Sequence, residues 1–352
     1  MTRIAAVHGD LAPHRHAQRE ITDMVARTCL PRGADRTVLD RLHRSAKVDS
    51  RHMTLPLERY EELGGFGAAN DVFIAAATEL GGRAVREALH KAGLSAADVD
   101  LLIFTSVSGI ATPSIDARIA ARLGLRRDVK RLPMFGLGCA GGAGGLARMH
   151  DYLLGRPDHV AVLVSVELCS LTFQRNDASM ANLVATGLFG DGAAAVVGFG
   201  AQRRSESAGP TIVDARSHLY PDTGRLLGLD VKDTGFRVVL DPRVPDVIRR
   251  HLTEDVERFL GEHGLKKKDV TAWVCHPGGP KVLEAVTEAL DLPASTVDVS
   301  WRHLASVGNL SSSSVLHILR DTLADTPPPP GTPGVLLAMG PGFACELVLL
   351  RW

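Results

Sequence analysis

The sequence predicts an α/β fold whose strands are buried on both faces. Short apolar runs of strand length alternate with amphipathic helical stretches from residue 101 onward. This alternation is typical of a sheet covered by helices on both sides. The chain has 352 residues, which is enough for two ordinary domains or one large double domain with a substantial core.

The first half of the alternation carries three strands and two helices. LLIFTSV (101–107) and HVAVLVSVEL (159–168) are nearly continuous apolar runs, as expected of buried strands, and RLPMFGL (131–137) is a third strand. ARIAARLGL (117–125) and GGLARMHDYLLG (144–155) have helical periodicity.

A polar stretch at 200–210 separates this half from a second one, so we expect one unit over residues 1–205 and another over 206–352. The pattern then restarts with helices at 251–265 and 281–292 around a strand at 270–276. The proline-rich segment TPPPPGTPG should be a rigid surface loop, and GVLLAMG and FACELVLL after it are typical of a terminal β-hairpin.

The two halves share a local pattern that suggests a divergent internal repeat. GLGCAGGAGGLARMHDYL and SVGNLSSSSVLHILRDTL each run from glycine through small residues into an amphipathic helix. The repeat predicts two related helices whose N-termini meet across a pseudo-twofold axis.

Charge and cysteine content exclude several classes of protein. Lys+Arg and Asp+Glu both number 40, which argues against a binder of nucleic acid or of an anionic membrane. No apolar run reaches membrane-spanning length, and the first residues lack a signal-peptide core. The number of cysteines is odd and their spacings form no pairs, which indicates reduced thiols and a cytoplasmic protein. The cysteines are Cys29, Cys139, Cys169, Cys275 and Cys345.

Cys139 lies among glycines and alanines at the start of a predicted helix. The positive end of a helix and a nearby imidazolium both lower the pKa of a thiol, and small neighbours let a substrate approach. The pattern therefore indicates an activated nucleophile. A small, inert core cysteine is the competing interpretation.

His276 ends the strand of VCHPGGPK, where α/β proteins present catalytic groups, although a surface-loop histidine would fit the same pattern. Cys275 should point to the opposite face of the strand, so the two residues should not form a metal site. No other cluster has the spacing of a zinc site, and no metal is expected.

Asn309 in SVGNLSSSS is either a helix N-cap or an amide donor to a thioester oxygen. The serines after it form no G-x-S-x-G elbow, which argues against a serine hydrolase. Phe189 lies in GLFGDGAAAVV, which lacks the G-x-G-x-x-G of a dinucleotide site.

Together these segments resemble the type III polyketide synthases, the chalcone-synthase-like family of thiolase fold. The resemblance runs over nearly the whole chain and rests on LGCAGG, VELCSLTF, GLFGDGAAAVV, CHPGGPKVL, VGNLSSSSVL and MGPGF. It implies a thiolase-like five-layered αβαβα fold made of two pseudo-repeated halves, and it implies a homodimer.

The resemblance also implies roles for the three residues. Cys139 would be acylated by an acyl-CoA starter, with His276 keeping it as a thiolate. His276 and Asn309 would bind the thioester oxygen while malonyl-CoA loses CO₂, and the enolate would attack the acyl group on Cys139. No metal or redox cofactor would be needed for this condensation, and the substrates would be free CoA thioesters.

Family likeness further implies which residues surround the substrate. Phe189 and Phe236 would be gatekeepers between the CoA tunnel and the cavity. A basic entrance for CoA would use Arg41, Arg44, Lys47 and Lys281, which could equally be solvated surface charges. The implied cavity-lining residues are Val107, Cys169, Thr172, Leu227, Gly228, Ser311, Gly340, Pro341, Gly342 and Phe343.

The stretches SAKVDSRHMTLPLERY and TPSIDARIAARLGL resemble actinobacterial synthases of long-chain alkylpyrones and alkylresorcinols. We therefore expect a fatty acyl-CoA starter extended by two or three malonyl units. A malonyl-only, tetrahydroxynaphthalene-type synthase is the alternative, although Val107 stands where those relatives carry cysteine. A β-ketoacyl synthase III-like single condensation and a non-catalytic thiolase-fold subunit are further alternatives.

Overall fold

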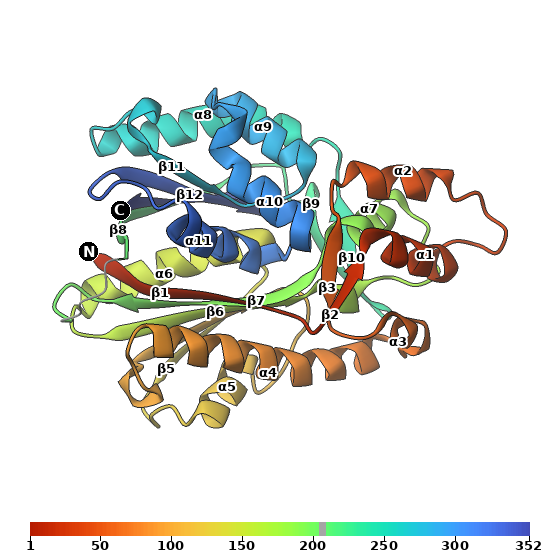
Figure 1. Cartoon of the computed structure of the whole chain (residues 1–352), viewed down its shortest axis with the longest axis horizontal. Coiled ribbons are helices and arrows are strands. Elements are labelled where there is room, and N and C mark those ends of the chain that lie inside the picture. Colours follow the sequence, from red (N-terminus) through yellow and green to blue (C-terminus); the bar gives the residue numbers. More distant parts are fainter. Residues whose placement is uncertain (204–208) are drawn as a thin grey trace.

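The computed structural model describes residues 1–203 and 209–352, and it has five alternating layers of helix and sheet (Figure 1). One half of the main sheet and its outer helices lie below a central helical layer, and the other half of the sheet, with its own outer helices, lies above it. The predicted five-layered thiolase-like fold is confirmed. The predicted boundary between residues 205 and 206 falls outside the described residues.

The elements follow the chain in an order that interleaves strands and helices. The strands are β1 (Thr2–Leu11), β2 (His14–Ala17), β3 (Ser50–Met53), β4 (Leu101–Ser106), β5 (Lys130–Phe135), β6 (Val160–Leu168), β7 (Asp191–Phe199), β8 (Thr211–Leu219), β9 (Leu227–Lys232), β10 (Gly235–Leu240), β11 (Ala272–Cys275), β12 (Pro333–Gly340) and β13 (Ala344–Arg351). The α-helices are α1 (Gln18–Cys29), α2 (Thr37–Ser45), α3 (Leu57–Glu62), α4 (Phe66–Lys91), α5 (Ile115–Leu123), α6 (Gly141–Gly155), α7 (Met180–Leu188), α8 (Val244–Glu262), α9 (Pro280–Leu290), α10 (Asp298–Val307) and α11 (Ser314–Asp325).

The described strands include a nine-stranded sheet in the order β11-β12-β13-β8-β1-β7-β6-β4-β5. β4 pairs in parallel with β5 and β6, while β7 runs antiparallel to β6 and β1. The two halves of the sheet meet where Thr2 and Arg3 of β1 pair with Ile212 and Thr211 of β8. All nine residues of β6 are buried, as its continuous apolar sequence predicts.

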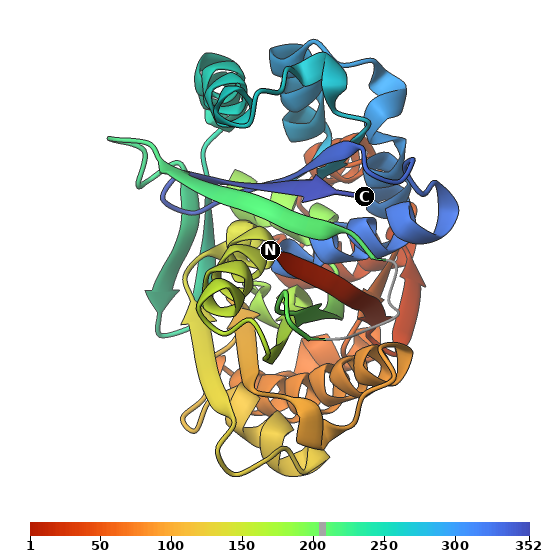
Figure 2. The same ribbon diagram turned by 90° about the vertical axis from the view of Figure 1, so that its left-hand side faces the viewer.

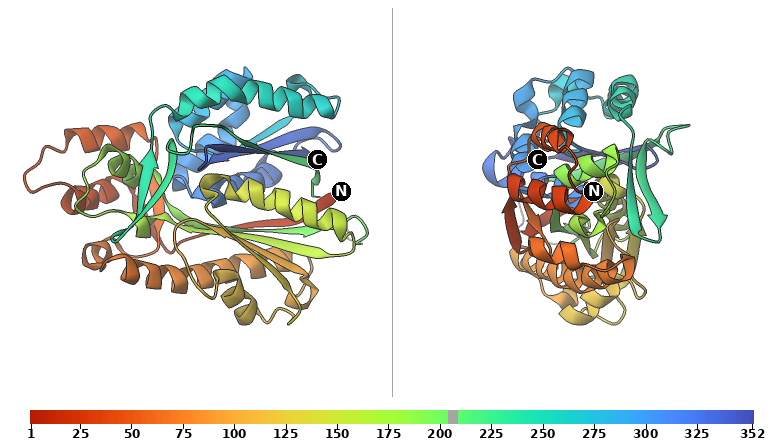
Figure 3. Two further views of the ribbon diagram at one scale, coloured as in Figure 1. Left: turned by 180° about the vertical axis from the view of Figure 1, so that it is seen from behind. Right: turned by 90° about the vertical axis from the view of Figure 1, so that its right-hand side faces the viewer.

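The helices α6 and α11 form the central layer between the two halves of the sheet (Figure 3). Both begin after a short 3₁₀ turn, over Gly138–Ala140 and Ser311–Ser313. A Cβ on Gly142 would lie 2.3 Å from the carbonyl oxygen of Ser312, so only glycine allows this approach of the two N-termini. The predicted meeting of two related helix N-termini is therefore confirmed.

Most predicted elements are present with shifted ends. The helix predicted at 251–265 begins at Val244, because Pro245 and Asp246 fit the first helical turn. The terminal hairpin forms as predicted, from β12 and β13. The alternation did not predict the hairpin of β9 and β10, which forms a separate two-stranded ribbon.

Both termini lie on the same side of the molecule (Figure 2). The lobe opposite that side holds α1, α2, α3 and α7 (Figure 1). Among the residues that the structure describes, no helix combines the length and the apolar character needed to cross a membrane.

Candidate active site

Cys139 lies in the turn between β5 and α6, and its side chain is half-buried. Its Sγ is 3.7 Å from Oγ of Ser311, at the start of the other central helix. Gly138 has φ +49°, and a Cβ there would lie 2.5 Å from Cδ of Pro341. Glycine before the cysteine is thus required both by the turn and by the close approach of the MGPGF segment.

His276 follows β11 directly, and both of its buried ring nitrogens lack a hydrogen-bond partner. Asn309 is fully buried, and its Nδ2 also has no partner, while its Oδ1 accepts a hydrogen bond from the backbone N–H of Ser311 at 2.7 Å. Cys139, His276 and Asn309 line one cavity of about 50 Å³. Buried polar groups are nearly always paired, so these free donors indicate a site for an oxygen-bearing ligand.

A second cavity, of about 60 Å³, shares Cys139, Phe189, Leu227 and Val238 with the first. The predicted lining residues divide between the two. The second cavity holds Val107, Cys169, Thr172, Leu227, Gly228, Ser311 and Pro341, and the first holds Leu227 and Phe343. Gly340 and Gly342 flank Pro341 without lining either cavity.

The two predicted gatekeepers have different positions. Phe189 lines both cavities and pairs with Asn309 in a β-bridge, so it stands where the cavities meet. Phe236 lines neither cavity and packs against Phe66, with ring centroids 5.2 Å apart. Val238, two residues further along β10, lines both cavities instead.

The electrostatics differ from the sequence-based expectation of a lowered thiol pKa. Burial raises the pKa of Cys139 to about 12, against a smaller lowering effect of its contact with Ser311. Burial also lowers the pKa of His276 to about 3, so this imidazole is neutral. Removing the groups from water disfavours both charged forms, and no imidazolium is present to favour a thiolate.

Glu167 is a buried carboxyl group beside the site that the sequence analysis did not single out. It accepts hydrogen bonds from Oγ of Ser108 at 2.8 Å and from the backbone N–H of Val107 at 3.1 Å. Ser312 also donates to it, and burial raises its pKa. A single acidic residue inside the apolar strand HVAVLVSVEL was the available signal, because a buried carboxyl group needs dedicated partners.

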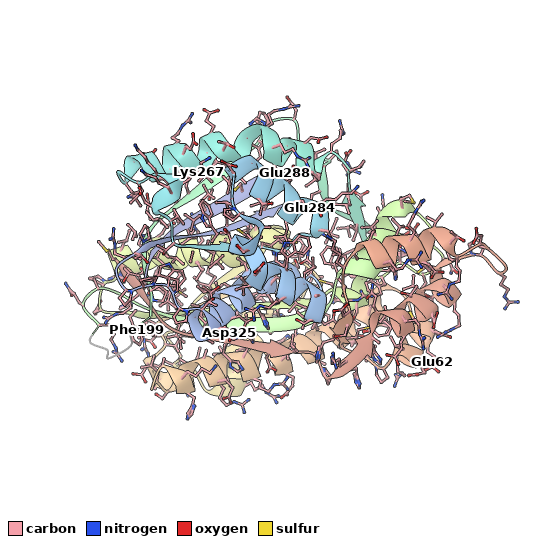
Figure 4. The ribbon with its side chains drawn as sticks, turned by 45° about the horizontal axis from the view of Figure 1, so that its top comes forward. Glu62, Phe199, Lys267, Glu284, Glu288 and Asp325 are labelled. Carbon is pink, nitrogen blue, oxygen red and sulfur yellow. The ribbon has the colours of Figure 1, made fainter. Side chains whose placement is uncertain are left out.

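The four predicted basic residues are all exposed. Arg41 and Arg44 lie on α2, Lys47 lies just after it, and Lys281 lies on α9. Lys281 precedes Val282, which lines the cavity of His276. Lys47 forms an ion pair of 3.4 Å with Glu284, which Figure 4 labels on α9. Across residues 1–203 and 209–352 there is no cluster of three or more histidine, cysteine or acidic side chains suited to a metal ion.

Comparison with solved structures defines the class of protein. The chain superimposes on 1,3,6,8-tetrahydroxynaphthalene synthase from Streptomyces coelicolor, a bacterial type III polyketide synthase, with a TM-score of 0.93. The match covers 99% of each chain at 30% sequence identity. The layers and the paired central helices are thus those of a type III polyketide synthase.

Sequence comparison gives the family. Residues 6–202 match the N-terminal domain of chalcone and stilbene synthases, and residues 211–352 match the C-terminal domain. The chain belongs to this family and is a type III polyketide synthase, an acyltransferase.

Two curated relatives share one name. The chain is 58% identical to 1,3,6,8-tetrahydroxynaphthalene synthase from Streptomyces peucetius subsp. caesius, over 100% of this chain and 93% of that protein. It is 32% identical to the enzyme of the same name from Streptomyces griseus, over 97% of this chain and 87% of that protein.

Proposed function

We propose that this enzyme uses malonyl-CoA as both starter and extender and makes 1,3,6,8-tetrahydroxynaphthalene. The observation that carries the proposal is the 58% identity, over the entire chain, to a synthase of that product. This favours the alternative of the sequence analysis over the alkylpyrone or alkylresorcinol synthase. Val107 differs from the cysteine expected of such enzymes, and the proposal requires that valine at this position still leaves room for the chain.

The lining of the cavities suits a growing carbon chain. Apolar side chains form most of the walls of both cavities at Cys139. A malonyl starter adds only two carbons to the growing chain after it loses CO₂.

Loading is a transthioesterification at Cys139. As Sγ attacks the thioester carbonyl, its proton moves to the neutral His276, and His276 then gives a proton to the departing CoA thiolate. The S–H and C–S(CoA) bonds break while the Cys139 thioester and the CoA thiol form. Because burial lowers the pKa of His276 to about 3, the imidazolium would exist only during this exchange.

Extension begins with the loss of CO₂ from a second malonyl-CoA. The unpaired donors of His276 and Asn309 bind the thioester oxygen, and they stabilise the enolate that remains. The enolate carbon attacks the acyl group on Cys139, and the Cys139 thiolate leaves. The extended chain is then a CoA thioester, which is loaded onto Cys139 again before the next extension. Five malonyl-CoA molecules supply ten carbons with loss of five CO₂, and ring closure eliminates water.

CoA itself would remain at the surface beside the cavity of His276. Its phosphates carry negative charge, and Arg41, Arg44, Lys47 and Lys281 provide exposed positive charge around α2 and α9. The chain's own groups bind and orient the CoA thioesters, and the proposed reaction needs no further cofactor.

The enzyme would act as a homodimer in the cytoplasm. The edge strand β5 exposes Leu132 and Phe135, at 37% and 54% of their surface, and an unpaired edge with apolar side chains favours association with a second copy. All five cysteines are free thiols, as expected of a reducing compartment. Light scattering of the purified protein tests the dimer.

Mass spectrometry of the products tests the proposed function. The purified enzyme is given malonyl-CoA alone, and then malonyl-CoA with acetyl-, hexanoyl-, lauroyl- or palmitoyl-CoA, with Cys139→Ala as the control. We expect a pentaketide from malonyl-CoA alone that the variant does not make. Long-chain triketides or tetraketides would instead establish the alkylpyrone or alkylresorcinol synthase, and a single condensation would establish the β-ketoacyl synthase III-like enzyme.

A further inference from the structure

Tyr220 connects an outer helix to a wall of the active-site cavity. Its buried ring stacks between His251 of α8, with centroids 4.8 Å apart, and Phe343 of the MGPGF segment, with centroids 6.0 Å apart. Phe343 is 1% exposed and lines the cavity of Cys139 and His276. One face of Tyr220 therefore supports a side chain that the growing polyketide would touch.

Backbone hydrogen bonds also hold Tyr220 and Phe343 next to each other. The N–H of Tyr220 donates to the carbonyl oxygen of Phe343 at 3.0 Å, and the N–H of Phe343 donates to Oγ1 of Thr223 at 2.7 Å. Oγ1 of Thr223 in turn donates to the carbonyl oxygen of Tyr220 at 2.7 Å. Gly342 before Phe343 has φ +137°, a backbone conformation that favours glycine, and the hydrogen bonds to Tyr220 and Thr223 hold Phe343 at the end of this turn.

The hydroxyl group of Tyr220 is held on the side away from the cavity. It donates a hydrogen bond of 2.6 Å to Oδ2 of Asp255 on α8, and Oδ1 of Asp255 lies 3.2 Å from Nδ1 of His218. Burial raises the pKa of Tyr220, so the phenol remains a donor throughout the physiological range. Both oxygens of Asp255 are thus engaged, and the ring of Tyr220 cannot slide without breaking a charge-assisted bond.

We propose that Tyr220, anchored by Asp255, is a positioning residue that sets the place of Phe343 and thereby the number of extensions before ring closure releases the product. This inference deepens the proposed function and rests on it. The loading and decarboxylation groups do not contact Tyr220, so its effect is on how far the chain grows. Without the hydroxyl bond, the stack of Tyr220 and Phe343 can shift into or away from the cavity and change the space for the last units.

The test compares Tyr220→Phe and Asp255→Asn with a matched control, Tyr152→Phe. Tyr152 also has a hydroxyl hydrogen bond, of 2.7 Å to Nδ1 of His159, but it lies in neither cavity wall. With malonyl-CoA we expect Tyr220→Phe and Asp255→Asn each to change the ratio of full-length product to shorter pyrones at least threefold. The rate of acylation of Cys139 should stay within twofold of the wild type, and Tyr152→Phe should keep the wild-type ratio.

An unchanged product ratio in Tyr220→Phe would overturn the inference and leave the proposed function intact. If Tyr220→Phe does not fold, Asp255→Asn decides the question, because it keeps the size of the side chain and removes the negative charge that holds the Tyr220 hydroxyl group and His218. If the wild type makes no pentaketide, the proposed function fails. A crystal structure of the variant then tests the positioning alone, because an unmoved Phe343 ring would refute it.

Discussion

His276 provides a test of how strongly the active site excludes water. Its pKa is lowered from 6.5 to about 3 by burial. The unfolded chain therefore takes up a proton as the pH falls below 6.5, while the folded protein does not until about pH 3. Each pH unit in this range removes ~1.4 kcal/mol of stability. Between pH 6.5 and pH 5, this single imidazole should lower the free energy of unfolding by about 2 kcal/mol.

His276→Gln removes this titration and keeps a hydrogen-bond donor in the cavity. Guanidinium titrations at pH 7 and pH 5 should therefore show a loss of stability about 2 kcal/mol smaller in the variant than in the wild type. Asn309→Ala is the control, because it removes a polar group from the same cavity without removing a titratable one. An equal loss in the wild type and His276→Gln would show that the imidazole is solvated, and the reasoning from burial would be wrong.

Three further predictions follow from the same geometry. Because burial raises the pKa of Cys139 to about 12, its alkylation by iodoacetamide should rise about tenfold per pH unit from pH 7 to 9; a plateau near neutrality would indicate a thiolate. Gly142→Ala should lower Tm by about 3 °C, since its Cβ would press on the backbone of Ser312, whereas Gly155→Ala, in open space in the same helix, should not; equal Tm values would contradict the close packing. Lys281→Glu should raise the KM for malonyl-CoA about fivefold at low salt, with kcat unchanged, and the effect should shrink in 0.5 M salt; a KM insensitive to the charge would remove Lys281 from the CoA entrance.

The fold was predictable where complete burial produces an unbroken apolar run or a clear helical periodicity in the sequence. β6 is buried along its whole length and reads as an unbroken apolar run, and α6 and α11 follow glycine- and serine-rich turns with helical periodicity. The ribbon of β9 and β10 was not predictable in the same way. LGLDVK alternates apolar and polar residues, but most residues of the ribbon are half-exposed or exposed, so no buried apolar run marks it. Its place beside the cavity is set by tertiary packing.

The position of the site was also predictable, but its electrostatics were not. A cysteine, a histidine and an asparagine each stand at a strand end or helix start, which is where the fold brings polar groups together. The direction of the pKa shift of Cys139 depends on how completely its surroundings exclude water. The exclusion of water around Cys139 depends on residues distant in the sequence, such as Phe189 and Leu227, so a local motif does not predict it.

In the proposed mechanism, the neutral state of Cys139 and His276 would protect the nucleophile until a substrate binds. A permanent thiolate would react with any electrophile that entered the cavity, whereas a thiol with a pKa of about 12 is nearly inert at neutral pH. A bound thioester would change this balance, because its oxygen would pair with the free donors of His276 and Asn309 and its carbonyl carbon would accept the sulfur as the proton moves to His276. In this proposal, charge appears only while the acyl group is transferred. The low dielectric of the cavity, which opposes ionisation at rest, strengthens each hydrogen bond to the oxyanion at that moment.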